Sequence, residues 1–370
     1  MFCPYLAVTV LALCAAAPPQ EAPERILQQA VSKHQAGDVE GAIVAYRKYL
    51  AVRPDSPSVR SDLGVALSRA GRYEEAITEY QAALKESRDP RVAMNLALAF
   101  YKSGQISRAA AELSPLQKMQ PANQQITLLL ADSWLRMGED GKVIELLTPI
   151  ENQSQDNLAI AYLLGMALLR DKKPERAQQY IDRILRNGDS AEARLLMATA
   201  KLTAMDNTGA IADLEKAVQL NPRLPEAWSY LGRAQMDSGN SPAARIAFQK
   251  ELEQNPNDFE SNLNLAVLMK QEQDYDGARK LLARALRVRP GDFAARFQVA
   301  AVDLATGNVE KARVNLESIL KEAPQFVEAH VSLATVYYRL KRKADGDRER
   351  EIVQKLNAEL QAQQTRGKVQ

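Results

Sequence analysis

The sequence predicts an all-α protein, built as a solenoid of about ten helix–turn–helix units. The first observation is an alanine that returns about every 33 to 34 residues, or at twice that spacing where Val143 replaces it. The second is a proline that recurs at similar intervals. These residues are Ala42, Ala76, Ala109, Ala177, Ala210, Ala244, Ala278 and Ala312, with Pro54, Pro121, Pro222, Pro256, Pro290 and Pro324. One such hairpin cannot bury its own apolar faces, so we expect the units to stack on one another.

The stretch of residues 225–257 shows the unit most completely. Trp228, Leu231 and Gly232 are spaced to share one face of a first helix, and Ala244 and Phe248 share one face of a second. Gly232 and Ala244 carry almost no side chain, so the two helices can approach closely there. We expect Trp228 and Phe248 to fill the buried volume beside that contact.

The sequence also predicts where these two helices begin and end. Gly239 and Asn240 make the turn between them. Ser241 is the predicted N-cap of the second helix, and Pro242 stands at its first position, where the missing N–H costs nothing. Pro256 then stops the helix.

The spacing W-x2-L-G, A-x3-F and a closing proline in this stretch resembles the tetratricopeptide repeat, a helical hairpin of about 34 residues. The resemblance covers about residues 22–340. It implies a right-handed superhelix whose first helices line a concave surface that holds a partner protein or peptide. Some members clamp a partner's C-terminal carboxylate with Lys, Asn and Arg in fixed places. Asn95 and Asn264 stand at one such place, but the rest of the set is absent, so we predict no carboxylate clamp.

The spacing of the repeats divides the chain into five segments. Residues 1–17 are a predicted signal peptide, 18–22 a short linker, 23–340 the repeat array, 347–364 a C-terminal capping helix, and 365–370 a frayed tail. The capping helix is predicted from the stripe Ile352, Leu356 and Leu360 among charged residues. The ten repeats are predicted at 23–56, 57–89, 90–123, 124–157, 158–190, 191–224, 225–258, 259–292, 293–326 and 327–346.

The apolar run from Leu6 to Ala17 is too short to span a bilayer comfortably. It ends in three alanines and is followed by a polar, proline-containing stretch, which is typical of a secretory signal peptide. We therefore expect export to the periplasm or the cell exterior, with no transmembrane helix in the mature chain. Two alternatives are a lipid anchor on Cys14 and a buried first helix.

Nothing in the sequence predicts catalysis. The formal net charge is +2 with both signs mixed, so there is no basic field for nucleic acid. The two histidines, His34 and His330, lie in the first and last units and cannot meet in an extended solenoid. Phosphate-binding, hydrolase and metalloprotease motifs are absent. We predict no enzyme activity, metal, cofactor or small-molecule substrate, and leave the oligomeric state open.

Two patterns in the first helices predict a partner-binding groove. Positions 5, 9 and 12 of repeats three to six are mostly apolar, and position 13 is basic in repeats two to five. The groove residues are Met94, Leu98, Tyr101, Leu128, Leu135, Tyr162, Met166, Leu169, Leu195 and Leu202, with Arg69, Lys102, Arg136 and Arg170. Alternatively, the apolar side chains are buried between adjacent first helices and the cations complement helix dipoles. If a variant with Leu135→Asp and Met166→Asp stays folded and still binds the partner, we expect the site elsewhere, around Arg233 and Lys270.

The predicted function is that of a non-enzymatic scaffold of the cell envelope or exterior, binding a partner protein or peptide in its concave groove. Two alternatives remain. One is a structural or assembly subunit that acts by self-association, and the other is a regulatory subunit of an envelope enzyme complex.

Overall fold

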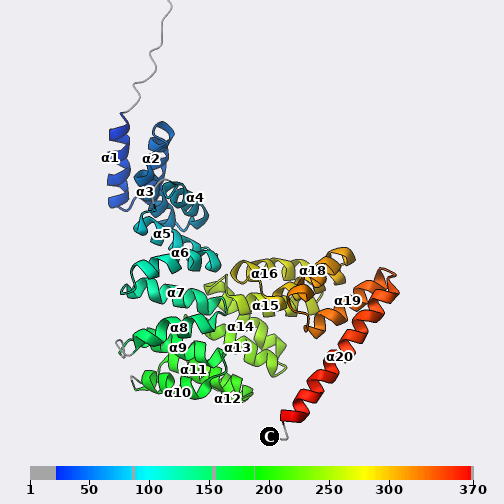
Figure 1. Ribbon diagram of the computed structural model, residues 1–370. Coiled ribbons are helices and arrows are strands. Elements are labelled where there is room, and N and C mark those ends of the chain that lie inside the picture. The colour runs from blue at the N-terminus through cyan, green and yellow to red at the C-terminus, as the bar shows by residue number, and fades with distance from the viewer. Residues whose placement is uncertain (1–21, 86–87, 152–155, 187, 368–370) are drawn as a thin grey trace, which may run out of the picture. The chain divides into compact units, whose positions relative to one another are not determined.

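The structure is a computed structural model that describes residues 22–85, 88–151, 156–186 and 188–367. These residues form twenty helices and no strand, joined in consecutive pairs by short turns (Figure 1). The all-α solenoid is thereby confirmed. The predicted signal peptide and most of the linker after it lie outside the described residues. Within them, no helix is long and apolar enough to cross a membrane.

Each pair consists of a first and a second helix. The first helices are α1 (Pro23–Gln35), α3 (Pro57–Arg69), α5 (Pro90–Lys102), α7 (Gln124–Arg136), α9 (Leu158–Arg170), α11 (Ala191–Thr203), α13 (Ala227–Asp237), α15 (Phe259–Gln271), α17 (Phe293–Ala305) and α19 (Val327–Arg339). The second helices are α2 (Val39–Val52), α4 (Tyr73–Ala83), α6 (Ile106–Met119), α8 (Asp140–Glu151), α10 (Pro174–Leu185), α12 (Asn207–Leu220), α14 (Ser241–Gln254), α16 (Tyr275–Val288), α18 (Val309–Glu322) and α20 (Lys343–Gly367). Nine first helices begin where the register begins a repeat, whereas α13 begins two residues after Pro225.

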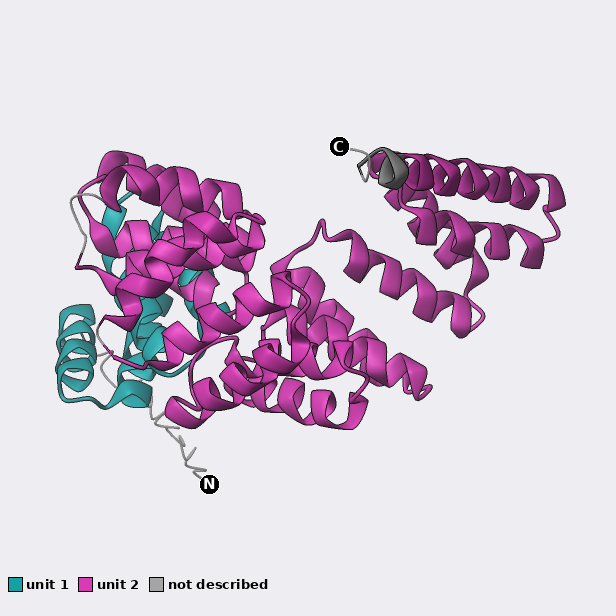
Figure 2. Ribbon diagram, turned by 90° about the horizontal axis from the view of Figure 1, so that it is seen from below, with its two compact units in different colours: residues 1–95 teal, residues 96–370 magenta. Residues whose placement is uncertain are grey.

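The chain forms two compact units, residues 1–95 and residues 96–370, with the division inside α5 (Figure 2). Both units show the close helix contact that the small residues predict. In the first unit, a Cβ atom on Gly64 of α3 would lie 2.5 Å from the ring of Tyr80. In the second, a Cβ atom on Gly232 would lie 2.6 Å from the ring of Phe248.

Two details of the most complete repeat differ from the prediction. Helix α14 begins one residue early, so its N-cap is Asn240, whose side chain accepts a hydrogen bond from Ala243 N at 3.3 Å. Trp228 is only half-buried, because it lies in the first turn of the late-starting α13, at the margin of the core cluster. Its Nε1 donates to the carbonyl of Pro222 at 2.9 Å, and Lys250 Nζ lies 4.1 Å from its ring centroid.

Every hairpin turn contains one residue in the left-handed backbone region, at position 15 of its repeat. Six of these are glycine: Gly37, Gly71, Gly104, Gly138, Gly239 and Gly307. The other four are Lys172, Met205, Gln273 and Lys341, with φ between 57° and 64°. The turn geometry is therefore kept in all ten repeats, even where no glycine marks it in the sequence.

The last hairpin keeps the register further than the sequence suggests. Its second helix, α20, begins at Lys343 rather than 347. Gly346 stands where the other repeats carry alanine or valine, and a Cβ atom there would lie 2.7 Å from the ring of Tyr338. The helix has 25 residues, against 14 in α18, and runs past the end of α19 (Figure 1). The predicted apolar stripe is only partly covered, since Ile352 and Leu360 are exposed.

Candidate partner-binding site

In the second unit, repeats three and four meet repeats seven and eight. Ile106 of α6 belongs to the same buried cluster as Phe259 of α15, and Tyr101 packs against that cluster. A Cβ atom on Gly104 would lie 2.3 Å from the side chain of Asn257, so the chain comes very close there. These contacts close the array into a ring in this region, which the repeat register does not predict.

Arg289, the C-cap of α16, connects the two sides of this contact between distant repeats. Its Nε donates to the carbonyl of Arg136 at the end of α7, at 2.6 Å. Its Nη1 donates to Glu260 Oε1 at 3.2 Å, and its guanidinium carbon lies 4.0 Å from the ring centroid of Phe259. One side chain thus joins residues 153 positions apart in sequence.

Arg170, the last residue of α9, is held by three acceptors from other helices. Its Nη1 donates to the carbonyl of Leu135 at 2.8 Å, its Nε to Tyr230 Oη at 2.9 Å, and its Nη2 to Glu226 Oε2 at 2.7 Å. The pairing with Glu226 compensates its charge away from bulk water.

Glu226 reaches Arg170 because α13 starts late. As the N-cap of that helix, Glu226 has φ 67°, in the left-handed region, and its N–H donates to Glu251 Oε1 at 3.0 Å. A non-glycine residue held in this region costs about 1–3 kcal/mol and persists only where its surroundings fix it. The ion pair to Arg170 and the bond to Glu251 are the contacts that fix it here.

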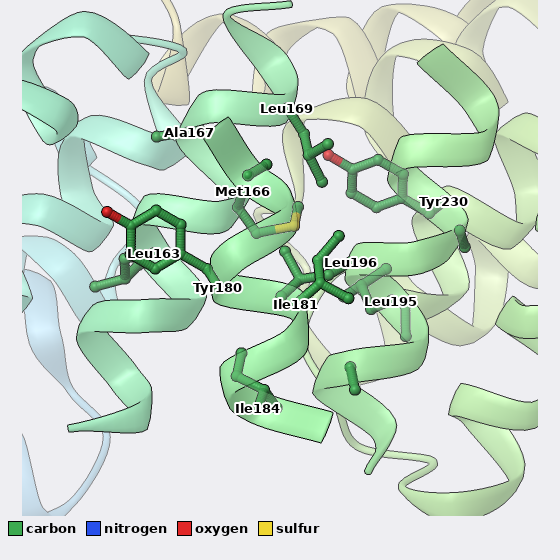
Figure 3. Packing of buried hydrophobic residues seen from close by; sticks show 14 of the residues in the cluster. Leu163, Met166, Ala167, Leu169, Tyr180, Ile181, Ile184, Leu195, Leu196 and Tyr230 are labelled. Atoms are coloured by element: carbon green, nitrogen blue, oxygen red, sulfur yellow. The ribbon is translucent and has the colours of Figure 1, made fainter. Parts of the chain in front are cut away.

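A cavity of about 470 Å³ lies on the inner side of these helices. Residues of five consecutive repeats, four to eight, line it: Gly138, Asp140, Leu169, Arg170, Lys172, Thr199, Leu202, Thr203, Met205, Ser229, Tyr230, Arg233, Glu260 and Arg289. Leu169 and Tyr230 form an apolar wall that continues into the core with Met166 and Leu195 (Figure 3). The volume is in the range of small-ligand pockets.

Two polar atoms of the cavity lining have no hydrogen-bond partner among the described residues. They are Ser229 Oγ and Asp140 Oδ1. Ser229 is only 2% exposed. A buried polar atom without a partner costs about 1–3 kcal/mol.

Burial raises the pKa of Asp140 to about 6, although Arg170 and Arg289 oppose the shift. The lining also carries Lys172 and Arg233, so four basic side chains face two acidic ones, Asp140 and Glu260. The cavity therefore favours a segment with negative charge near its rim. Within the part of the chain that the structure describes, no cluster of three or more His, Cys, Asp or Glu side chains could hold a metal ion.

Four of the ten apolar residues of the predicted groove belong to the core. Leu135, Met166, Leu169 and Leu195 are buried, so they cannot form the open apolar stripe expected of them. The reason is that neighbouring first helices pack against each other through these positions, as the alternative interpretation held. Half-buried positions are Met94, Leu98, Tyr101, Leu128, Tyr162 and Leu202. Of the ten, Leu169 and Leu202 line the cavity.

The predicted cations have different environments. Arg69 and Lys102 are exposed. Arg136 Nε donates to Asp132 Oδ2 at 2.8 Å, and its guanidinium lies 5.2 Å from the ring centroid of Tyr101. Arg170 lines the cavity but also bonds the last turn of α7, so it serves a neighbouring helix end.

Of the two residues predicted for the alternative site, Arg233 and Lys270, only one lines the cavity. Arg233 lines the cavity, whereas Lys270 Nζ donates to Gln298 Oε1 at 2.6 Å and does not. Sequence reasoning missed Asp140, Ser229, Glu260 and Arg289. Ser229 stands at a groove position whose change to a polar residue is visible in the register. Glu260 stands at position 2 of its repeat, another groove-facing position of the tetratricopeptide pattern. Asp140 and Arg289 lie outside the groove-facing positions, and no sequence signal marks them.

These features define a class: an α-solenoid scaffold with a cavity that five consecutive repeats line. A family model described as the Tetratricopeptide repeat protein 21 N-terminal ARM repeat matches residues 67–304, and a Tetratricopeptide repeat model matches residues 33–99. The chain belongs to the tetratricopeptide repeat family. The resemblance found in the sequence is thereby confirmed, and such repeats are typical of protein–protein interaction.

Three known proteins illustrate the relationship. A TPR repeat-containing protein of Pseudomonas aeruginosa is 29% identical over 51% of this chain and 81% of its own length. Anaphase-promoting complex subunit 3 of Schizosaccharomyces pombe is 28% identical over 35% of this chain. The match spans only 19% of that protein's length. The APC/C hetero-tetramer Cut9-Hcn1 has a similar fold, with a TM-score of 0.58, 11% identity, and coverage of 91% of this chain and 88% of that one.

Proposed function

We propose that this protein is a scaffold that holds a segment of a partner protein in the cavity of repeats four to eight. The observation that carries the proposal is a cavity of about 470 Å³ that five consecutive repeats line, with four basic side chains and only two acidic ones. An apolar side chain of the segment rests on Leu169 and Leu202. Acidic groups beside it face Arg233 and Lys172 at the rim.

The exposed side chain of Met205 gives a direct test. Met205 is 87% exposed and lines the cavity, whereas Ile246 is 55% exposed on the second helix α14 and does not line it. A photo-crosslinking residue placed at 205 should capture the partner segment from a native extract, and the same residue placed at 246 should not. Equal capture from both positions would contradict the proposal.

A matched pair of variants separates the cavity from the rest of the surface. Arg233→Glu with Leu202→Asp should abolish the crosslink from position 205, because the double variant reverses one charge of the cavity lining and replaces an apolar lining side chain with a carboxylate. Lys250→Glu, on α14, should leave it unchanged. Circular dichroism must show unaltered helix content in all three chains.

We also propose that the protein acts outside the cytoplasm. The support is the apolar run from Leu6 to Ala17 with its small-residue end. Intact-mass measurement of protein from its native host should give a chain that begins near Ala17 or Pro18. A retained Met1 would contradict export, and an acylated Cys14 would replace the cleaved peptide with a lipid anchor.

A further inference from the structure

The last hairpin leaves a groove of about 390 Å³ between α19 and α20. It is lined by Val331, Ala334, Thr335, Tyr338, Arg350, Val353 and Gln354. These are positions 5, 8, 9, 12, 24, 27 and 28 of repeat ten. The groove thus uses a defined set of repeat positions.

The same positions in repeat nine show what belongs in such a groove. They include Phe297, Ala300, Leu304, Leu316 and Ile319, which pack in one cluster with residues of α19. In repeat nine this surface of α17 and α18 therefore holds the first helix of the next repeat. The groove of repeat ten is the equivalent socket, and no helix among the described residues occupies it.

Helix α20 is longer than the helix on which it packs. One face of α20 carries residues 346, 349, 353, 356 and 360, because the spacing between them alternates between three and four positions. That face meets α19: a Cβ on Gly346 would contact Tyr338, and Glu349 Oε2 lies 2.5 Å from His330 Nδ1. Because α19 begins at Val327, it covers only the first part of α20.

Helix α20 has 25 residues and α19 has 13, so α20 projects by roughly 18 Å at about 1.5 Å per residue. Leu360, on the projecting part of this face, is 49% exposed, and Val331 in the socket is 50% exposed. Together with Tyr338 and Ile352, the last hairpin holds four of the twelve exposed large apolar side chains of the described residues. The socket thus presents Val331 and the projecting end presents Leu360, and both lie on the same hairpin.

We propose that two copies of this chain associate through their last hairpins about a two-fold axis. The projecting end of α20 from each copy lies in the socket of the other. The two α20 helices run antiparallel, so the face that covers α19 in its own copy continues onto α19 of its partner. Such an interface is isologous: Leu360 of one copy meets the socket around Val331 of the other, and the reverse.

The interface is small, so the association should be weak. A standard protein interface takes about 20–30 residues from each side, and the socket with the projecting end offers fewer. We therefore expect a dimer that forms in the micromolar range and dissociates on dilution.

The first test is the mass of the full-length chain by light scattering and sedimentation over a dilution series. Wild type should approach twice the chain mass at high concentration and one chain mass on dilution. Val331→Glu and Leu360→Glu should each remain at one chain mass throughout. Val314→Glu, at an exposed site on α18 outside the groove, should behave as wild type.

A disulfide test fixes the geometry independently of stability. With Cys3 and Cys14 changed to Ser, a chain carrying Val331→Cys is mixed with one carrying Leu360→Cys. A mixed disulfide dimer should form on mild oxidation. Either chain alone should form little disulfide-linked dimer under the same conditions. A wild type that stays monomeric at all concentrations would overturn the proposal, as would a dimer that persists in both Glu variants.

Discussion

Helix α13 packs closely on α14 at Gly232 because this residue has no side chain. Gly232→Ala would place a Cβ atom 2.6 Å from the Phe248 ring, which is buried and cannot move aside freely. We expect a loss of about 1–3 kcal/mol in the free energy of unfolding, measured by urea denaturation.

Gly141→Ala is the matched control. It lies in the first turn of α8, where an added Cβ meets nothing within 4 Å. The gain in helix propensity should raise stability by up to about 0.8–1 kcal/mol. If both substitutions had the same effect, the close contact at 232 would be of no consequence for stability.

Glu251 makes stability depend on pH. It is buried, and this burial, followed by the neighbouring charge of Asp258, raises its pKa to about 8 from an ordinary value of 4.5. Between these two values the folded state holds a proton that the unfolded state has released. The contribution of Glu251 to stability is therefore full below about pH 4.5 and is lost as the pH rises toward 8.

Glu251→Gln should remove this dependence. The wild type should lose up to about 1.4 kcal/mol per pH unit relative to the variant across this window. Urea denaturation at several pH values measures the difference, with Glu253→Gln, at an exposed site on the same helix, as the control. Parallel pH profiles for wild type and Glu251→Gln would show that Glu251 titrates as it does in the unfolded chain.

At the scale of the helical hairpin, the turn residue is the point where sequence and geometry disagree. Gln273 has φ 64°, a conformation that costs a non-glycine residue about 1–2 kcal/mol. Gln273→Gly should therefore stabilise the protein, by about 0.5–1 kcal/mol after the greater entropy of glycine in the unfolded chain is subtracted.

Gly307→Ala is the reverse experiment. Gly307 has φ 81° at the same repeat position, with open space where a Cβ would lie. The substitution should lower the midpoint of thermal unfolding while Gln273→Gly raises it. A change of the same sign in both would mean that the backbone relaxes out of the left-handed region.

The hairpins could be predicted because their signals are local. Small residues at the helix contact recur in every unit, and a glycine turn and a stop signal recur in most of them. Four turns without glycine, Gly346 and the late start of α13 escaped the pattern. Gly346 escaped because glycine replaces the expected alanine. The late start of α13 depends on Glu226 finding Arg170, 56 residues earlier, which no local pattern encodes.

At the scale of the second unit, Arg289 makes stability less local than in an open solenoid. Arg289→Ala removes the bond to the carbonyl of Arg136 and the pairing with Glu260. We expect a loss of about 1–3 kcal/mol. Hydrogen exchange should become faster both in α15 and α16 and at the end of α7.

Arg284→Ala, at an exposed position on the same helix, is the control and should change neither region. Faster exchange confined to α15 and α16 after Arg289→Ala would mean that each repeat is stabilised by its sequence neighbours alone.

The closure and the cavity could not be predicted from the register. Whether repeat three meets repeat seven depends on the small rotation that each hairpin adds, and these rotations sum over several repeats. The register shows which residues face inward but not which of them meet across the ring. Leu135 and Met166 therefore looked like an open groove, and Asp140 and Arg289 gave no signal at all.

The closed ring also bears on how this chain can change over evolutionary time. Tandem repeats commonly gain or lose units by duplication and deletion of DNA. Removing one unit between Arg136 and Arg289 would shift the two residues by a whole hairpin, break the bond between them and dismantle the cavity. Units near either end are under no such constraint. The number of hairpins between repeats four and eight should therefore be invariant among descendants of this gene, while the number at its ends drifts.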